Sequence, residues 1–154
     1  MDAIVREFLA GRHVAVLGTT NRDGSVHLAN VWYLLEGDFV YMQTADSTVK
    51  AKNVVRTRTA SLVVDSRGRR AWRGASTSGP AQLITEPGEV QPLRERIMAR
   101  YMTAQGMADP RVGGRMRVGD NSIIRLTPTK WKWWSVDEMF SNEIRDGYML
   151  PLSD

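Results

Sequence analysis

The stretch of residues 41–53, YMQTADSTVKAKN, carries the side chains best suited to chemistry. It joins the end of an apolar strand to a polar loop and to the start of a helix, for which Ser47 or Thr48 can serve as N-cap. Thr44, the two candidate caps and Lys50 therefore meet at one strand–loop–helix junction. Free backbone N–H groups, the positive end of the helix dipole and an ammonium favour an anion there, and phosphate is the usual one. A capped surface helix with a solvated lysine fits the same residues.

The chain offers little for nucleophilic or metal chemistry. It has no cysteine, which removes disulfides, thiolate metal ligands and cysteine nucleophiles. His13 and His27 stand apart from any carboxylate cluster or reactive serine motif, so they indicate neither a metal site nor a catalytic triad. This pattern is typical of enzymes whose reactive atoms belong to a cofactor, and it identifies no catalytic residue.

Length and composition predict one globular domain over residues 1–154. Of the 154 residues, 42% are hydrophobic and 25% are charged, as in ordinary soluble proteins. No apolar run approaches the roughly 20 residues of a membrane span, and the first residues do not read as a signal peptide. We therefore expect a cytoplasmic protein with no membrane partner. The net charge of +4 comes without a nucleic-acid-binding motif, so no nucleic-acid partner is expected.

Periodicity and turn residues predict a mainly β fold, a small barrel with flanking helices. Asp23-Gly24 between two apolar runs is a strong hairpin signal. Pro80 predicts a bulge or an edge in a long strand, and Pro92 begins a helical pattern. The expected elements are, in order, a helix at 2–10, strands at 14–19 and 26–35, a strand from 38, the helix after the junction, strands at 60–65 and 72–85, a helix at 92–104, a loop at 109–119, strands at 122–126 and 130–136, and a tail at 137–154.

The order and spacing of these motifs resemble a known family. The patterns V-LGT-N-DG-VH-NVWY, G-D-VYMQT----KAKN and ASLVVD are similar to the FMN-binding split barrel of the pyridoxamine 5'-phosphate oxidase type, over about residues 5–135. More closely, they resemble the actinobacterial, F420-dependent branch of the flavin/deazaflavin oxidoreductases. The arginine-rich, lysine-poor composition suits a GC-rich actinobacterial genome. The resemblance implies a homodimer with its cofactor sites at the subunit interface.

The same resemblance implies a phosphate site at the junction. In pyridoxamine-phosphate oxidases a threonine and a lysine six residues later bind the flavin phosphate, and Thr44 and Lys50 have that spacing. Val49 and Asn30 stand where the oxidases have arginines. The substrate-phosphate arginine and histidine of the oxidases are missing, which argues against vitamin B6 oxidation. The implied cofactor-binding residues are Asn30, Val31, Trp32, Tyr33, Gln43, Thr44, Ser47, Thr48, Lys50, Asn53, Arg73, Trp131 and Trp134.

Coenzyme F420, whose lactyl-phosphate and oligoglutamate tail is long and polyanionic, fits these departures better than FMN. Lys50, Lys52, Arg56 and Arg58 can follow such a tail, although a solvated basic helix face has the same composition. The implied function is hydride transfer between reduced F420 and an unsaturated or conjugated small molecule. The alternatives are an FMN-dependent oxidase or reductase, and a non-catalytic cofactor-binding or tetrapyrrole-binding protein.

Tryptophans are the other candidates for contact with a cofactor ring. In residues 130–135, KWKWWS, strand alternation places Trp131 and Trp133 on one face and Trp134 on the other. A tryptophan can pack beside a tricyclic ring, and it equally fills a core or a dimer interface. Tyr33 and Arg73 are candidates for proton donation only because their strands are expected to face the ring.

Overall fold

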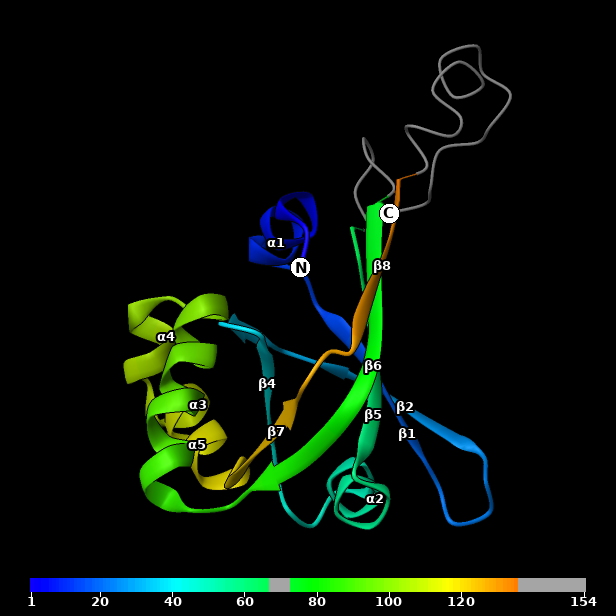
Figure 1. Cartoon of the computed structure of the whole chain (residues 1–154). Helices are drawn as coiled ribbons and strands as arrows, with labels where there is room; N and C mark the ends of the chain where they lie inside the picture. Colours follow the sequence, from blue (N-terminus) through cyan, green and yellow to red (C-terminus); the bar gives the residue numbers. More distant parts are fainter. Residues whose placement is uncertain (67–72, 136–154) are drawn as a thin grey trace, which may run out of the picture.

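The computed structural model describes residues 1–66 and 73–135 (Figure 1). The strands are β1 (Ala15–Thr20), β2 (Val26–Val31), β3 (Leu34–Glu36), β4 (Phe39–Thr44), β5 (Thr59–Asp65), β6 (Arg73–Ile84), β7 (Ser122–Leu126) and β8 (Lys130–Ser135). The helices are α1 (Ala3–Ala10), α2 (Val49–Thr57), α3 (Pro87–Tyr101), α4 (Ala104–Ala108), α5 (Arg115–Gly119) and the π-helical turn η1 (Pro110–Gly114). The tail expected at 137–154 lies outside the described residues.

The strands form one curled antiparallel sheet that half closes into a barrel, with the helices on its flanks (Figure 1). The path through the eight-stranded sheet is β2-β1-β5-β6-β7-β4-β3, and β8 pairs with β6 outside this path. Helices α3, α4 and α5 gather on one side, at the left of Figure 1, and α2 lies at the bottom. The mainly β split barrel predicted from the sequence is confirmed.

The strand expected at 26–35 is in fact two strands. β2 pairs with β1, whereas β3 pairs with β4, so the chain passes from one half of the sheet to the other at Trp32 and Tyr33. Tyr33 is fully buried, and its hydroxyl donates to the Leu9 carbonyl at 2.8 Å. The sequence prediction of one strand is wrong here because both halves are apolar and extended, and only their pairing partners differ.

β6 joins the two halves of the barrel as one continuous strand of 12 residues. Its first half pairs with β5 and β8, and its last four residues pair with β7. Pro80 stands where the partner changes, so its missing N–H costs no ladder bond, and its carbonyl accepts from the N–H of Thr127 at 2.8 Å. Gly79 leaves no room for a Cβ beside the Thr127 carbonyl. The bulge or edge predicted at Pro80 is therefore a change of partner within one long strand.

The helical region departs further from the sequence prediction. α3 begins at Pro87, where proline is favoured, and Pro92 lies inside the helix instead of starting it. Residues 109–119, expected as a loop, form η1 and α5. Asp109 caps η1, because its carboxylate accepts from the N–H of Arg111 at 2.8 Å. The loop prediction is wrong because short capped turns carry too few residues to show a helical period. The predicted start of α3 is misplaced because Pro92 carries the same helix-start signal as Pro87.

Two clusters of buried side chains hold these elements together. The larger cluster fills the barrel with residues such as Leu17, Leu62 and Ile124. The smaller cluster packs α3 against β6 and β7, through residues such as Ile97 and Ile123. Within residues 1–66 and 73–135, no helix is both long enough and apolar enough to cross a membrane.

Arg100, near the end of α3, fastens the N-terminal segment to the barrel. Its guanidinium donates to the carbonyls of Leu9, at 2.8 Å, and of Gly11, and it lies 4.9 Å from the centre of the Tyr33 ring. The hydroxyl of the next residue, Tyr101, donates to the carbonyl of His13 at 2.7 Å. The exposed end of α1 and the first residues before β1 are therefore held by side chains from α3.

Replacing Arg100 by alanine is expected to lower the free energy of unfolding by about 2–3 kcal/mol, because the carbonyls of Leu9 and Gly11 lose a charged donor. Arg96→Ala, on the same helix, is the matched control. Its ion pair with Glu36 at 3.0 Å is half exposed and is worth less than about 1 kcal/mol. Urea unfolding followed by tryptophan fluorescence measures both variants. Equal losses would contradict the role given to Arg100.

Candidate functional site

The junction between β4 and α2 forms as the sequence predicts, with Thr48 as the N-cap. The Thr48 hydroxyl accepts from the N–H of Ala51 at 3.4 Å and donates to the carbonyl of Ala45 at 2.8 Å. It also lies 3.0 Å from the hydroxyl of Thr44, which is buried at the end of β4. Ser47, the other candidate cap, is exposed. Both threonine hydroxyls are therefore engaged inside the junction and fix its shape.

The first turn of α2 keeps donors that an anion could use. The first N–H groups of a helix have no intrahelical partner, and within the described residues those of Val49 and Lys50 have no hydrogen-bond acceptor. Lys50 is half-buried, and it follows Thr48 by two positions. These two N–H groups and the ammonium are the part of the junction that can bind a phosphate.

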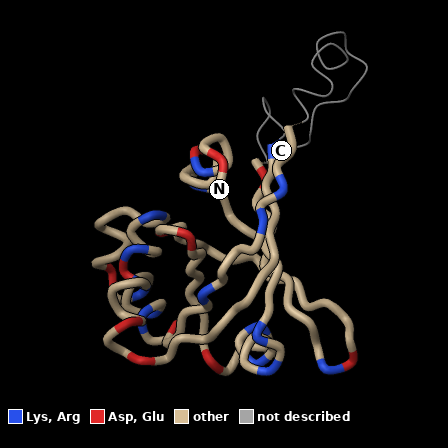
Figure 2. Tube along the Cα trace, in the orientation of Figure 1, with Lys and Arg blue, Asp and Glu red and all other residues tan. Residues whose placement is uncertain are grey.

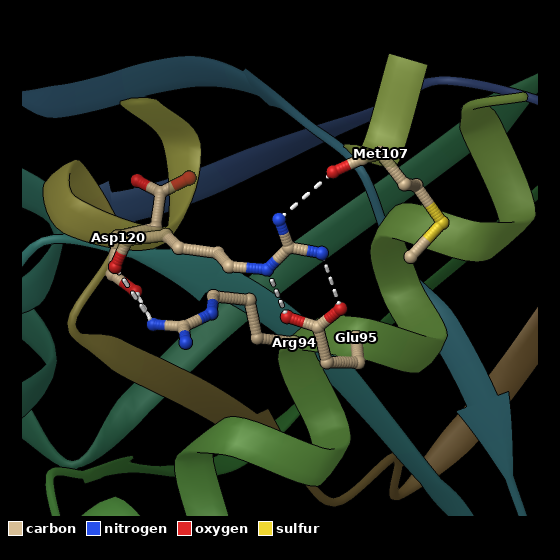
Figure 3. A network of polar contacts seen from close by, with 5 residues as sticks. Arg94, Glu95, Met107 and Asp120 are labelled. Atoms are coloured by element: carbon tan, nitrogen blue, oxygen red, sulfur yellow. Dashed lines mark hydrogen bonds and ion pairs between the residues drawn. The ribbon is translucent and has the colours of Figure 1, made fainter. Parts of the chain in front are cut away.

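A partly buried polar network lies beside the junction, and Figure 3 shows the part of it that contains Arg94, Glu95 and Asp120. The Gln43 amide donates to a carboxylate oxygen of Asp120 at 2.9 Å. The guanidinium of Arg94 donates to the backbone carbonyls of Asp120, at 3.0 Å, and of Arg117, at 2.9 Å, and Figure 3 shows it reaching across to Asp120. Arg117 in turn makes two bonds to Glu95, at 2.6 and 2.7 Å. Gln43 thus orients Asp120 beside the junction and does not face open solvent.

The Asp120 carboxyl has a perturbed acidity. Burial raises its pKa, and the Gln43 hydrogen bond and the charges of Lys50 and Arg94 oppose that rise. Sequence analysis missed both Asp120 and Arg94. No nearby sequence motif marks either residue, because Asp120 reaches the junction only through the pairing of Ser122 with Thr44 across β7 and β4.

Asn53, predicted to bind the cofactor, is directed elsewhere in the fold. Its amide donates to the Thr19 hydroxyl at 3.2 Å and to the Asn21 side chain at 2.9 Å. Its own oxygen accepts from Arg56 at 3.1 Å, and Arg56 also donates to the carbonyl of Thr20. Asn53 is buried and holds α2 against the β1–β2 hairpin, so the structure does not bring it to the Lys50 end of the helix.

The four consecutive residues implied to bind the cofactor, 30 to 33, have different surroundings. Asn30 is exposed on β2, and Val31 is buried in the barrel core. Trp32 stacks on Tyr101, with ring centres 4.9 Å apart and planes 8° from parallel. Tyr33 points into the core, and burial raises the pKa of its phenol. Its proton is donated to a backbone carbonyl, so this residue is not placed to protonate a substrate.

The tryptophans of β8 divide between the two faces as predicted. Trp131 and Trp133 pack against the barrel core, and Phe8 meets Trp133 edge-on at 5.2 Å. Trp134 lies on the other face, directly over Gly74, where a Cβ would collide with its indole. Arg73, the neighbour of Gly74, is exposed at the start of β6. Of the two β8 tryptophans implied to bind the cofactor, Trp134 is the one that lies outside the barrel core.

Basic residues gather on α2, as Figure 2 shows. Lys52 is exposed on the same helix as Lys50, and Arg58 follows the last turn. Arg58 and Arg125 line a cavity of about 540 Å³ between α2, β6 and β7, at the opposite end of the helix from the junction. Within residues 1–66 and 73–135 no group of three or more histidine, cysteine or acidic side chains could hold a metal ion.

The fold defines a split-barrel protein, and the first turn of α2 presents Lys50 and two N–H groups without an acceptor among the described residues. A sequence profile described as pyridoxamine 5'-phosphate oxidase matches residues 1–135. The chain belongs to this family, within the split-barrel flavin and deazaflavin oxidoreductase superfamily. A search of curated proteins finds no match.

Solved structures with the same fold are only distantly similar in sequence. A conserved hypothetical protein from Mycobacterium tuberculosis is 21% identical, with a TM-score of 0.71, and the match covers 100% of this chain and 91% of that one. An F420 reductase is 16% identical (TM-score 0.63), with 82% and 94% covered. A FAD-binding protein from Mesorhizobium loti is 14% identical (TM-score 0.64), with 88% and 95% covered. At these identities the likeness establishes the fold.

Replacing Thr48 by alanine is expected to lower the free energy of unfolding by about 1 kcal/mol, because α2 loses its cap and Thr44 loses its hydroxyl neighbour. Thr48→Ser keeps the capping oxygen and should recover most of the loss. Ser47→Ala is the matched control, since Ser47 is exposed and does not cap the helix. Thermal unfolding of the three variants measures the difference. A larger loss of stability for Ser47→Ala than for Thr48→Ala would show that Ser47, and not Thr48, caps the helix.

Proposed function

We propose that the protein binds coenzyme F420 and transfers hydride between the deazaflavin and an unsaturated or conjugated small molecule. The observation that carries the proposal is the junction itself. In a member of this family, Lys50 and two N–H groups at the start of α2 offer one cation and a helix N-terminus to a phosphate. Val49 and Asn30, in place of the expected arginines, leave this site with less positive charge than a terminal flavin phosphate would call for.

Each part of the chain has a defined task in this proposal. Bound F420 would supply a carbon that accepts and donates hydride, so the protein has only to bind, orient and exclude water. Lys50 and the first N–H groups of α2 hold the phosphate, and the exposed Lys52 extends the positive charge along the tail. Trp134 offers an apolar surface on the outer face of β8. The Tyr33 hydroxyl stays engaged with Leu9 and takes no part in proton transfer.

FMN is the second candidate cofactor, because the family profile is that of a flavin-phosphate enzyme. The same Lys50 and N–H groups would then hold a terminal phosphate. The two ligands differ in the charge of their phosphate and in the tail that F420 carries beyond it. Their affinities for the protein can therefore be compared directly.

Titration with F420, followed by quenching of tryptophan fluorescence, is expected to give a micromolar or tighter dissociation constant. Lys50→Ala should weaken binding by about tenfold or more, because a charge-assisted contact to phosphate is lost. Lys52→Ala, two residues along the same helix and exposed, is the matched control and should change affinity by less than about threefold. Preference for FMN would move the protein to the flavin branch. Binding of neither ligand would overturn the proposal, and binding without turnover of any acceptor would remove the catalytic part.

We also propose that a second copy of the chain covers the outer face of the sheet. Val26 and Leu28 on β2 are each 64% exposed, and they border a groove of about 350 Å³ with Val16 and Val63. Contiguous exposed apolar side chains on a sheet are unusual in a monomer and mark interaction surfaces. Lys130 and Lys132 at the edge of the groove supply a polar rim.

Leu28→Glu is expected to convert the dimer to a monomer, because it places a charge in the centre of the apolar face. Val118→Glu makes the same kind of change at an 86% exposed position on α5, away from this face, and should leave the dimer intact. Sedimentation velocity of both variants distinguishes the outcomes. A wild-type protein that sediments as a monomer at all concentrations would refute the assembly without touching the cofactor proposal.

A further inference from the structure

We propose that Asp120 is a selectivity residue, one that admits a phosphodiester to the junction and disfavours a terminal phosphate. The inference rests on the proposed function, since it concerns which cofactor the Lys50 site accepts. Residues 120 and 121 link α5 to β7 and lie against the loop between β4 and α2. The side-chain oxygen of Asn121 accepts from the N–H of Asp46 in that loop at 2.9 Å.

Asp120 is held in place from three elements. Gln43, on β4, donates to its carboxylate at 2.9 Å, and Arg94, on α3, donates to its backbone carbonyl at 3.0 Å. Lys50, on α2, is close enough for its charge to favour the ionised carboxyl. Arg94 is 9% exposed, and Gln43 is 8% exposed, so neither partner can swing out into water without losing its packing. The carboxylate therefore has a fixed place beside the cation that would bind phosphate.

The consequence is a balance of charge at the junction. Lys50 carries one positive charge, Asp120 carries one negative charge when ionised, and Arg94 directs its donors to two backbone carbonyls. A phosphodiester carries a single negative charge, whereas a terminal phosphate has a second pKa near 6 and is close to a dianion above neutral pH. Each further negative charge on the ligand is repelled by the Asp120 carboxylate in a partly buried setting, where such repulsion is weakly screened.

This arrangement also gives Gln43 a specific task. Its amide N–H donates to the Asp120 carboxylate, and its amide oxygen is buried with no partner among the described residues. Gln43 therefore directs one N–H at the Asp120 carboxylate and holds that carboxylate in place. The hydroxyl of the next residue, Thr44, is hydrogen-bonded to the hydroxyl of Thr48, the N-cap of α2. Gln43 is thus a positioning residue, and Asp120 is the group that acts on the ligand.

The test compares dissociation constants for F420, a phosphodiester, and FMN, a terminal phosphate, in the full-length protein at pH 8. Asp120→Asn should tighten FMN binding by about tenfold relative to F420. Asp120→Glu keeps the charge and should keep most of the wild-type ratio. Asp38→Asn is the matched control, because it changes the net charge by the same amount at a side chain that is 86% exposed and belongs to the β3–β4 turn.

A second measurement uses the wild-type protein alone and does not depend on any variant folding. Between pH 5.5 and pH 8, FMN gains its second negative charge, and the affinity for FMN should fall while that for F420 stays level. If Lys50 acted without Asp120, the dianion would bind more tightly as the pH rises. The basic groups whose charges act on Asp120 are Lys50 and Arg94.

The outcomes separate the two proposals. F420 binding with an FMN ratio that is unchanged in Asp120→Asn, or an affinity for FMN that rises with pH, overturns the selectivity role and leaves the proposed function standing. Absence of binding by both cofactors overturns the proposed function and this inference with it. A tenfold change in the ratio that also appears in Asp38→Asn would assign the effect to net charge and overturn the role of Asp120.

Discussion

The hydrogen-bond ladder along β6 is the constraint on which the rest of this structure depends. One strand satisfies β5 and β8 with its first half and β7 with its second half, so it fixes the two halves of the barrel relative to each other. Pro80 and Gly79 make the change of partner possible, since the first needs no ladder bond and the second lets Thr127 approach. β7 then sets the register of β4, which places Thr44 opposite Ser122 and brings Asp120 to the junction.

The candidate site follows from what that framework leaves unpaired. Folding already engages the hydroxyls of Thr44 and Thr48, an N–H of the Gln43 amide and the side-chain N–H groups of Asn53 within the protein. A buried polar group without a partner is costly, so these internal bonds fix the shape of the junction. What remains is the first turn of α2, whose N–H groups cannot be satisfied within the helix, and Lys50. The site is therefore small and weakly charged.

Sequence reasoning found those parts of the fold and site that depend on local signals. The helix after the junction, its threonine cap, the Asp23-Gly24 hairpin and the alternation of the β8 tryptophans are set by residues a few positions apart. It could not find what a distant partner decides. The break at Trp32, the change of partner within β6 and the packing of Asn53 against the β1–β2 hairpin depend on which strand or hairpin lies alongside. The approach of Asp120 to Gln43 joins residues 77 positions apart. No period or turn signal in one stretch carries such information.

The basic face of α2 shows how charge counted along a sequence differs from charge available in space. Four cations follow one another in the sequence, but Arg56 is turned back to the β1–β2 hairpin, where it donates to Thr20 and Asn53. Arg58 lines the cavity at the far end of the helix. Of these four cations, Lys50 and Lys52 then remain near the start of α2 to meet a polyanionic tail. The negative charge of ionised Asp120 offsets part of the positive charge of Lys50. A ligand with several dispersed carboxylates can reach both lysines, whereas a compact dianion must concentrate its charge beside the carboxylate, where repulsion is strongest.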